Sequence, residues 1–217
     1  MLFRSITTSA RVAEMVKLSE NAYRDVNIAF ANELSMVSDK LGIDVWEVIR
    51  LANRHPRVNV LSPGPGVGGH CIAVDPWFIV HSAPEITPLI RTARNVNDAK
   101  IDYVVGHASE LIEANPGRVA LLGLAFKANV DDFRESPALK VAADLAMRFG
   151  ERIAIVEPHT DTLPKAFEST GATLTDIDSA LMDCDIMIVL VDHDIFKSVP
   201  PEERDGKIVY DTRGIWS

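Results

Sequence analysis

Short runs of branched apolar residues in the second half of the chain constrain its fold more than any other feature. They occupy residues 119–124, 153–156, 172–174, 186–191 and 208–210. Runs this short and this continuously apolar are typical of buried parallel strands. Helical patterns separate them at residues 137–149, where Ser136 is the expected N-cap, and at 160–170 and 177–182. This alternation predicts the α/β fold class, with a doubly wound, Rossmann-like parallel sheet over residues 117–217.

The first half of the chain carries a helical period instead. Apolar residues recur at threes and fours over residues 10–52, with Gly42 as a stop and Asp44 as the N-cap of a second, short helix. The same period returns over residues 85–114, and at ~1.5 Å per residue a helix of that length exceeds the width of a small domain. We therefore expect a helical central domain over residues 1–116. Its long helix, 85–114, is expected to link the two domains and to pair with its twin in a homodimer.

A glycine-rich loop carries the strongest local signal, because residues 55–76 lose all periodicity. The segment Pro63-Gly64-Pro65-Gly66-Val67-Gly68-Gly69 leads to Cys71, and Asp75 follows four residues later. Such a loop lets backbone approach a ligand and then presents a thiol and a carboxylate on one face of a helical turn, where a helix N-terminus favours the thiolate. Two plainer alternatives stay open. Cys71 is a buried, inert thiol beside a tight turn, or Asp75 is a helix N-cap before Pro76.

Three polar residues of the first helix form a second candidate group. Lys17, Asn21 and Arg24 recur at intervals of four and three, which places them on one helix face. Two cations with an amide between them suit an anion or a developing oxyanion. The alternative is a solvated stripe in which Glu20 makes salt bridges with its cationic neighbours, and the spacing alone favours that alternative.

Basic residues near the glycine loop and after the predicted strands form the remaining candidates. Arg54, His55 and Arg57 precede the loop and suit a phosphate, whereas Phe126-Lys127, Arg134 and Arg213 follow predicted strands. Open sheets bind ligands at the carboxyl ends of their strands. Ordinary surface exposure is the alternative for both sets. No strand is followed by GxGxxG, so we expect the domain to bind something other than a dinucleotide by the usual route.

Composition excludes several classes of function. The chain has 22 basic and 31 acidic residues and a formal charge of -9, which disfavours nucleic acid and anionic membranes as partners. No apolar run approaches the roughly 18 residues of a bilayer span, and no signal peptide is recognisable, so a cytoplasmic protein is expected. Two cysteines without ligand spacing predict neither a disulfide framework nor a metal site, and the same holds for His70, His81, His107, His159 and His193. The residues interpreted as core are Cys184, Trp46, Trp77 and Phe78.

Four motifs, in order along nearly the whole chain, resemble the UDP-glucose/GDP-mannose dehydrogenase family. The motifs are Lys17-Leu18-Ser19-Glu20-Asn21, Gly68-Gly69-His70-Cys71-Ile72-Ala73-Val74-Asp75, Gly123-Leu124-Ala125-Phe126-Lys127 with Asp132-Phe133-Arg134-Glu135-Ser136-Pro137, and Asp211-Thr212-Arg213-Gly214. The segments 27–33, 52–57 and 69–77 resemble the branch that oxidises UDP-N-acetyl-D-mannosamine. The UDP-glucose branch is a poorer match, because an isoleucine follows Cys71 here.

The resemblance implies an activity and a set of site residues. It implies two successive hydride transfers to NAD, with Cys71 attacking an aldehyde and passing through a thiohemiacetal and a thioester, in the biosynthesis of a surface polysaccharide. Lys17 and Asn21 would stabilise an oxyanion or assist proton transfer, and Asp75 would hold the water or base. Arg134 would reach the NAD. The residues implied to touch the UDP-sugar are Arg24, His55, Arg57 (from a partner subunit), Gly68, Phe126, Lys127 and Arg213.

One departure from the family pattern shapes the expected activity. The family's N-terminal NAD-binding domain precedes the Lys-Leu-x-x-Asn helix, and here only the stub at residues 2–8 stands there. We expect most of the NAD site to be missing and the isolated chain to be inactive. Two alternatives belong to the same fold: a UDP-sugar-binding and dimerisation module without catalysis, and the UDP-N-acetylglucosamine 6-dehydrogenase sibling activity. An unrelated cysteine hydrolase is a third and weaker one, since His70 beside Cys71 faces away from it in most backbones.

Overall fold

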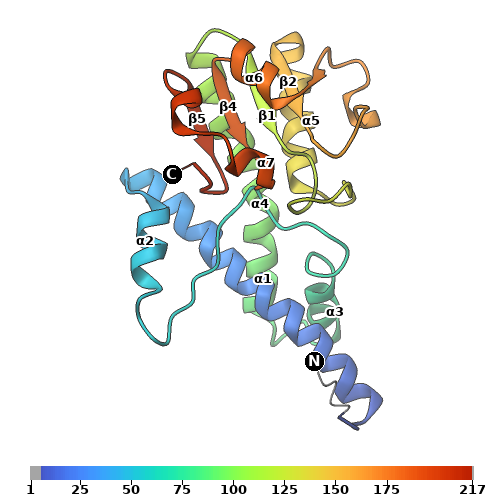
Figure 1. Cartoon of the computed structure of the whole chain (residues 1–217). Coiled ribbons are helices and arrows are strands. Elements are labelled where there is room, and N and C mark those ends of the chain that lie inside the picture. Colours follow the sequence, from blue (N-terminus) through green and yellow to red (C-terminus); the bar gives the residue numbers. More distant parts are fainter. Residues whose placement is uncertain (1–5, 217) are drawn as a thin grey trace.

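The computed structural model describes residues 6–216, so most of the stub at residues 2–8 lies outside the described part of the chain. Figure 1 shows a helical lobe and a sheet lobe, with the long helix α4 (Pro88–Ala114) running from the first into the second. The linking role predicted for helix 85–114 is therefore present. Within residues 6–216, no helix combines the length and the apolar character that a membrane crossing requires.

The helical lobe consists of α1 (Ala10–Leu41), α2 (Val45–Ala52), α3 (Asp75–Ser82) and the first half of α4. The predicted stop is confirmed, because Gly42 adopts a left-handed φ of 66° and its N–H bonds the carbonyls of Ser38 and Asp39. Asp44 caps α2 through the N–H of Trp46, as predicted. The sequence pattern did not predict α3, which is only eight residues long and begins at Asp75 itself rather than after it.

The sheet lobe is a five-stranded parallel sheet in the order β3-β2-β1-β4-β5. Its strands are β1 (Val119–Leu122), β2 (Ile153–Val156), β3 (Thr173–Thr175), β4 (Ile186–Val189) and β5 (Ile208–Asp211). Its α-helices are α5 (Pro137–Phe149), α6 (Ile177–Asp183) and α7 (Asp194–Lys197), and short 3₁₀ turns occupy η1 (Gly150–Arg152), η2 (Lys165–Phe167) and η3 (Pro201–Arg204). The predicted doubly wound parallel sheet is confirmed, and Ser136 caps α5 as expected.

The helix predicted at residues 160–170 is wrong. Only the 3₁₀ turn η2 forms there, directly after Pro164. Threonine side chains satisfy the local backbone instead, since Thr160 Oγ1 bonds both the N–H and the carbonyl of Thr162, and Thr170 Oγ1 donates to the carbonyl of Phe167. Hydroxyl groups that compete for backbone partners in this way favour turns over helices.

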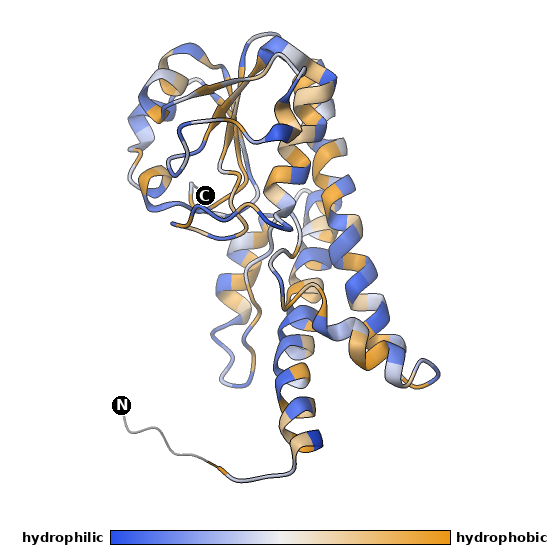
Figure 2. Ribbon diagram, turned by 90° about the vertical axis from the view of Figure 1, so that its right-hand side faces the viewer, coloured by the Kyte–Doolittle hydropathy of each residue, from blue (hydrophilic) through white to orange (hydrophobic). Residues whose placement is uncertain are grey.

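Helices cover both faces of the sheet. Apolar residues of α4 and α5 pack on one face with β1, β2 and β4, and residues of α6 and α7 pack on the other. The strands are hydrophobic along most of their length, as parallel strands buried on both faces must be (Figure 2). Cys184 is 2% exposed and is core, as predicted. Trp77 and Phe78 are not core, because they are 38% and 57% exposed on α3, and Trp46 is half-buried against Gly214.

A buried chain of hydrogen bonds joins α1, α4 and the glycine loop. Arg94 Nη1 donates to Asp25 Oδ1 at 2.7 Å, and Asn97 Nδ2 donates to the same oxygen at 2.8 Å. Asn32 Nδ2 donates to Asn97 Oδ1 at 2.9 Å, while Asn32 Oδ1 accepts the N–H of Gly64 at 2.9 Å. Charged groups this deeply buried are stable only when paired. The chain of bonds fixes where the glycine loop leaves the helical lobe.

A buried lysine between the lobes makes stability depend on pH. Lys100 is 4% exposed, its Nζ donates to Ser35 Oγ at 2.8 Å, and burial lowers its pKa from 10.5 to about 8. Between those two values the folded protein holds fewer protons at Lys100 than the unfolded chain does. The free energy of unfolding therefore rises with pH across this window, because the unfolded state binds the extra proton.

Replacing Lys100 with methionine is expected to remove this contribution. Relative to Lys100→Met, wild type should gain on the order of 3 kcal/mol in free energy of unfolding between pH 8 and 10.5. Urea unfolding of both proteins at pH 7, 8, 9 and 10 measures the difference. Parallel stability curves for the two proteins would contradict the assignment.

Candidate functional site

The glycine loop packs directly against the sheet lobe. A Cβ at Gly68 would lie 2.6 Å from the carbonyl oxygen of Glu135 and 2.6 Å from Pro137 Cδ, so a larger residue cannot occupy this place. Arg213 Nη1 similarly covers Gly64. Glycine is needed at position 68 because backbone of one lobe touches the other there, whereas at Gly64 the neighbour is the end of a side chain.

A cavity of about 530 Å³ opens between the lobes beside this contact. It brings together five residues that the sequence singled out from segments far apart in the chain: Arg24 of α1, Gly68 of the loop, Phe126 and Lys127 after β1, and Arg213 after β5. The other lining residues are Ile28, Leu61, Ser62, Gly64, Gly66, Val67 and Ile72. The volume falls in the usual range for small-molecule sites.

The cavity is electropositive. Three of its lining residues are cationic and none is acidic. Arg213 is held in place by Asp192, whose Oδ1 accepts from Nη2 at 2.8 Å and from Nε at 3.1 Å. Burial alone would raise the pKa of Asp192, but the neighbouring Arg213 outweighs it and keeps this carboxyl ionised. Arg24 and Lys127 have no ion-pair partner within residues 6–216, so their charge is available to an anionic ligand.

Cys71 immediately precedes Ile72, one of the residues that line this cavity. Its side chain is exposed, and its carbonyl accepts the N–H groups of Val74 and Asp75 at 3.1 and 2.8 Å. A helical turn therefore starts at Cys71 and leads into α3, which returns Asp75 to the same face. The buried Asn21 of α1 donates from Nδ2 to Asp75 Oδ2 at 2.5 Å. Asn21 and Asp75 thus form a hydrogen-bonded pair, Cys71 stands one helical turn before Asp75, and the alternative of a buried thiol does not apply.

The other predicted residues do not line the cavity. Lys17 is exposed, and its Nζ lies 3.8 Å from Glu20 Oε2. This is the salt bridge expected if the polar residues of α1 form only a solvated stripe. His55 and Arg57 are exposed on the loop after α2 and do not line the cavity. Arg134 is exposed and pairs with Asp132 at 2.7 Å, on an open surface outside the cavity. The roles that the resemblance implied for these residues remain predictions.

The sequence did not predict two residues that hold site residues in place, Asn32 and Asp192. Asn32 holds Gly64, but an asparagine inside a helix gives no signal of a partner thirty-two residues away. Asp192 orients Arg213, and it could have been found, since it stands just after β4 at the carboxyl edge where the other candidates were sought.

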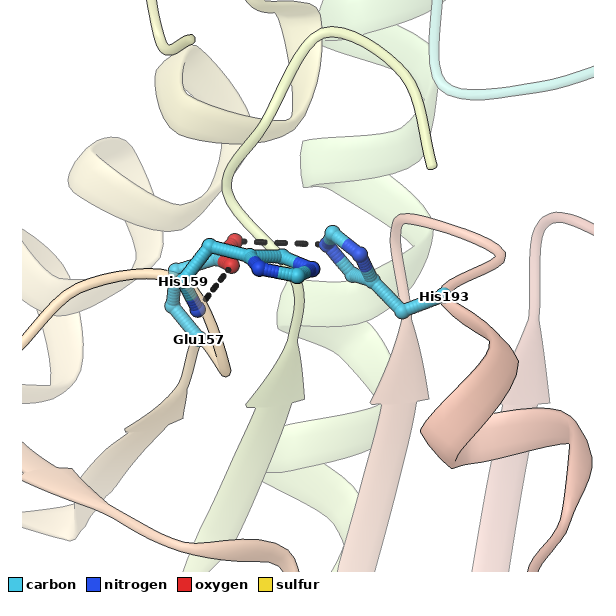
Figure 3. Close-up of side chains that lie close together, drawn as sticks. All are labelled: Glu157, His159 and His193. Atoms are coloured by element: carbon cyan, nitrogen blue, oxygen red, sulfur yellow. Dashed lines mark hydrogen bonds and ion pairs between the residues drawn. The ribbon is translucent and has the colours of Figure 1, made fainter. Parts of the chain in front are cut away.

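One cluster has the composition of a metal site, formed by Glu157, His159 and His193 (Figure 3). The tautomer of His193 argues against a metal ion. Its Nδ1 accepts the N–H of Asn129 at 3.0 Å, so the neutral ring carries its proton on Nε2, which faces Glu157 Oε2 at 3.4 Å. A protonated nitrogen cannot ligate a metal, and the cluster is better described as an internal hydrogen-bonded group.

Comparison with known proteins extends this description. The central-domain model of the UDP-glucose/GDP-mannose dehydrogenase family matches residues 11–99, and the UDP-binding-domain model of the same family matches residues 120–217. An NDP-N-acetyl-D-galactosaminuronic acid dehydrogenase of Ralstonia nicotianae is 53% identical over 99% of this chain and 50% of its own length. The UDP-N-acetyl-D-mannosamine dehydrogenase of Escherichia coli is 51% identical over 97% of this chain and 52% of its own length.

Solved structures agree with this comparison. The UDP-N-acetyl-mannosamine dehydrogenase of Staphylococcus aureus superposes with a TM-score of 0.79 at 40% identity, covering 97% of this chain and 49% of that one. The corresponding enzyme of Pyrococcus horikoshii also gives a TM-score of 0.79, at 35% identity, with 96% and 49% covered. The chain spans about half the length of the curated relatives it matches. Since both family domains match in order and together enclose the cavity, the chain belongs to the UDP-glucose/GDP-mannose dehydrogenase family of NAD-dependent nucleotide-sugar dehydrogenases.

Proposed function

We propose that the chain provides the nucleophile and the UDP-sugar site of an enzyme that oxidises UDP-N-acetyl-D-mannosamine to the corresponding uronate. The electropositive cavity between the lobes carries this proposal. Arg24, Lys127 and Arg213 converge on it without an acidic lining residue, and the exposed Cys71 is the chain neighbour of its lining residue Ile72. A diphosphate supplies the negative charge that such a cavity needs, and arginine suits its oxygens.

The residues of this chain account for the covalent and proton-handling part of the reaction. Cys71 Sγ forms a bond to the aldehyde carbon while its proton passes to the carbonyl oxygen, which gives a thiohemiacetal. After that carbon is oxidised, water breaks the carbon–sulfur bond, releasing the acid and restoring the thiol. Asn21 orients Asp75 through one carboxylate oxygen, which leaves the other oxygen to hold that water.

NAD is the oxidant of the family, and the loop after β1 does not have the features of a dinucleotide site. The loop after β1 lacks GxGxxG, and Glu157 already accepts its N–H groups at Leu124 and Ala125. We therefore propose that the chain alone does not reduce NAD, and that Arg134 contributes only at the edge of a dinucleotide site formed largely by other residues.

Relatives of similar identity are named for different sugars. The relative with 53% identity is named for N-acetyl-D-galactosaminuronic acid, whereas those at 50–51% are named for N-acetyl-D-mannosamine. The UDP-N-acetylglucosamine sibling activity and a binding module without catalysis remain the alternatives. Both alternatives retain the UDP cavity.

We also propose a homodimer, and the exposed apolar residues favour α1 over the predicted helix 85–114 as its contact. The apolar side chains of α4 are largely buried against α1 and the sheet. On α1, by contrast, an exposed series recurs every seven residues, the spacing of a helix–helix seam. Its members are Val16, Tyr23, Phe30 and Val37.

UDP should bind to the chain, and cavity cations should control its affinity. Lys127→Ala and Arg213→Ala are each expected to weaken UDP binding by about 10- to 100-fold, the loss typical of a charge-assisted hydrogen bond. Arg148→Ala, on the outer face of α5, serves as the control and should leave the affinity unchanged. Calorimetric titration with UDP, and with GDP and NAD as comparisons, measures this; equal affinity for all three ligands would refute a UDP site.

The position of Cys71 predicts protection by the sugar. The exposed Cys71 should react with iodoacetamide at least about tenfold faster than the buried Cys184, because only exposed thiols react readily. UDP-N-acetyl-D-mannosamine should slow this reaction, whereas UDP alone should protect little. Mass spectrometry of the two peptides follows both rates. Equal protection by UDP and by the UDP-sugar would favour the binding module.

The dimer contact can be assigned with two matched substitutions. Phe30→Asp places a charge in the α1 series and should convert the dimer to a monomer, while Leu89→Asp does the same on the predicted helix 85–114 and should not. Sedimentation equilibrium reports the outcome. The opposite pattern would assign the contact to α4, and a monomeric wild-type chain would end the proposal.

A further inference from the structure

The loop that carries Phe126 and Lys127 lies between two buried side chains. This loop follows β1, the central strand, and runs over residues 123–132. Glu157 stands directly after the neighbouring strand β2, and His193 stands shortly after the other neighbour, β4. Both side chains are fully buried, and Figure 3 shows them facing one another across the end of β1. Phe126 and Lys127, the proposed nucleotide contacts, thus belong to a segment that lies between Glu157 and His193.

Glu157 accepts hydrogen bonds from the backbone N–H groups at the start of the loop. Its Oε2 accepts from Leu124 N at 2.7 Å and from Ala125 N at 3.3 Å, and its Oε1 accepts from His159 N at 3.1 Å. Burial would favour the neutral acid, but the bonds from His193 and these N–H groups keep the pKa of Glu157 below its usual value. Glu157 is therefore an anion held by backbone amides.

The same amides have another use in related topologies. In dinucleotide-binding domains, the N–H groups directly after the first strand bind the pyrophosphate. Here a carboxylate of the chain itself occupies that position. The arrangement explains why this lobe presents Phe126 and Lys127 to a nucleotide by their side chains and does not present the amides of Leu124 and Ala125.

His193 holds the far end of the loop. Its Nδ1 accepts the N–H of Asn129, and its Nε2 faces Glu157. Asn129 also donates from Nδ2 to Asp194 Oδ2 at 2.7 Å and accepts the N–H of Asp194 at 3.1 Å. Asn129 adopts a left-handed φ of 59°, which asparagine tolerates better than most other non-glycine residues. Phe126 and Lys127 thus lie between two anchored points.

We propose that Glu157 is a built-in anion in the backbone amide site after β1, and that with His193 it is a positioning residue for Phe126 and Lys127. The first half of this statement is independent of any nucleotide, while the second rests on the proposed function. When Glu157 is removed, the vacated amide site should accept a small carboxylate such as formate.

Glu157 adjoins a cavity that is separate from the nucleotide cavity. Glu157 lines a second cavity of about 510 Å³ at the carboxyl ends of β2 and β3. Asp161, Asp176 and Asp178 line it as well, so an added anion meets repulsion on entry and must be supplied in excess. Once the Glu157 side chain is removed, we expect formate to reach Leu124 and Ala125 from this cavity, without competing for the site of UDP.

The first experiment follows thermal unfolding in formate or in chloride at equal ionic strength. The unfolding temperature of Glu157→Ala should rise saturably by several degrees in formate, because a ligand of the folded state alone stabilises it. Wild type and Glu168→Ala, an exposed control on the same lobe, should not respond, and neutral formamide should have no effect on any of the three. A Glu157→Ala protein that ignores formate would overturn the amide-site assignment.

The second experiment measures UDP affinity by calorimetry. Glu157→Ala should bind UDP at least tenfold more weakly than wild type and should recover most of that loss in formate. If Glu157→Ala does not fold, Glu157→Gln replaces it in this experiment, because glutamine keeps the shape of the side chain and loses its charge. A threefold or greater loss of UDP affinity in Glu157→Gln supports the positioning role. An unchanged affinity overturns it. If wild type itself does not bind UDP, the proposed function fails, while the formate response still tests the amide site.

Discussion

The hydrogen bond from Gly64 N–H to Asn32 Oδ1 is the contact on which the geometry of the site depends. It is the last member of a buried series that begins at Arg94 and passes through Asp25 and Asn97. Each member is almost completely buried, so losing one partner would leave a polar group without water or a replacement, which is costly. The glycine loop therefore has one position relative to α1 and α4. Because α4 continues into the core of the sheet lobe, the loop is also placed relative to the sheet.

That placement explains the glycines. The loop meets the sheet lobe with backbone against backbone at Gly68 and against the Arg213 guanidinium at Gly64. A side chain at Gly68 would separate the lobes and open the cavity between them, whereas one at Gly64 would displace the Arg213 guanidinium. Gly68 is thus needed for closing an interface between the lobes, and this interface also sets the position of the segment that leads to Cys71.

Electrostatics divides the carboxyl edge of the sheet into two sides. On one side Asp192 neutralises part of the charge of Arg213, yet Arg24 and Lys127 leave the interlobe cavity positive. On the other side Glu157 occupies the backbone amides after β1, and aspartates line the neighbouring cavity, which makes that side unsuited to a phosphate. A sheet with the topology of a dinucleotide-binding domain thereby carries its electropositive surface at the domain boundary.

The sequence by itself determined the kinds of elements and most of their ends. Strands, caps at Asp44 and Ser136, and the stop at Gly42 follow from short-range preferences, and the motifs indicated the family. Where local signals compete, as in the threonine-rich segment 160–170, the pattern misled. Only the tertiary structure decided that Arg24, Gly68, Lys127 and Arg213 share a cavity, that Lys17 and Arg134 stand apart from it, and that Trp77 and Phe78 are exposed. The physical reason is that periodicity reports which face of an element is apolar, whereas a site depends on contacts between residues distant in the chain, which no local pattern encodes.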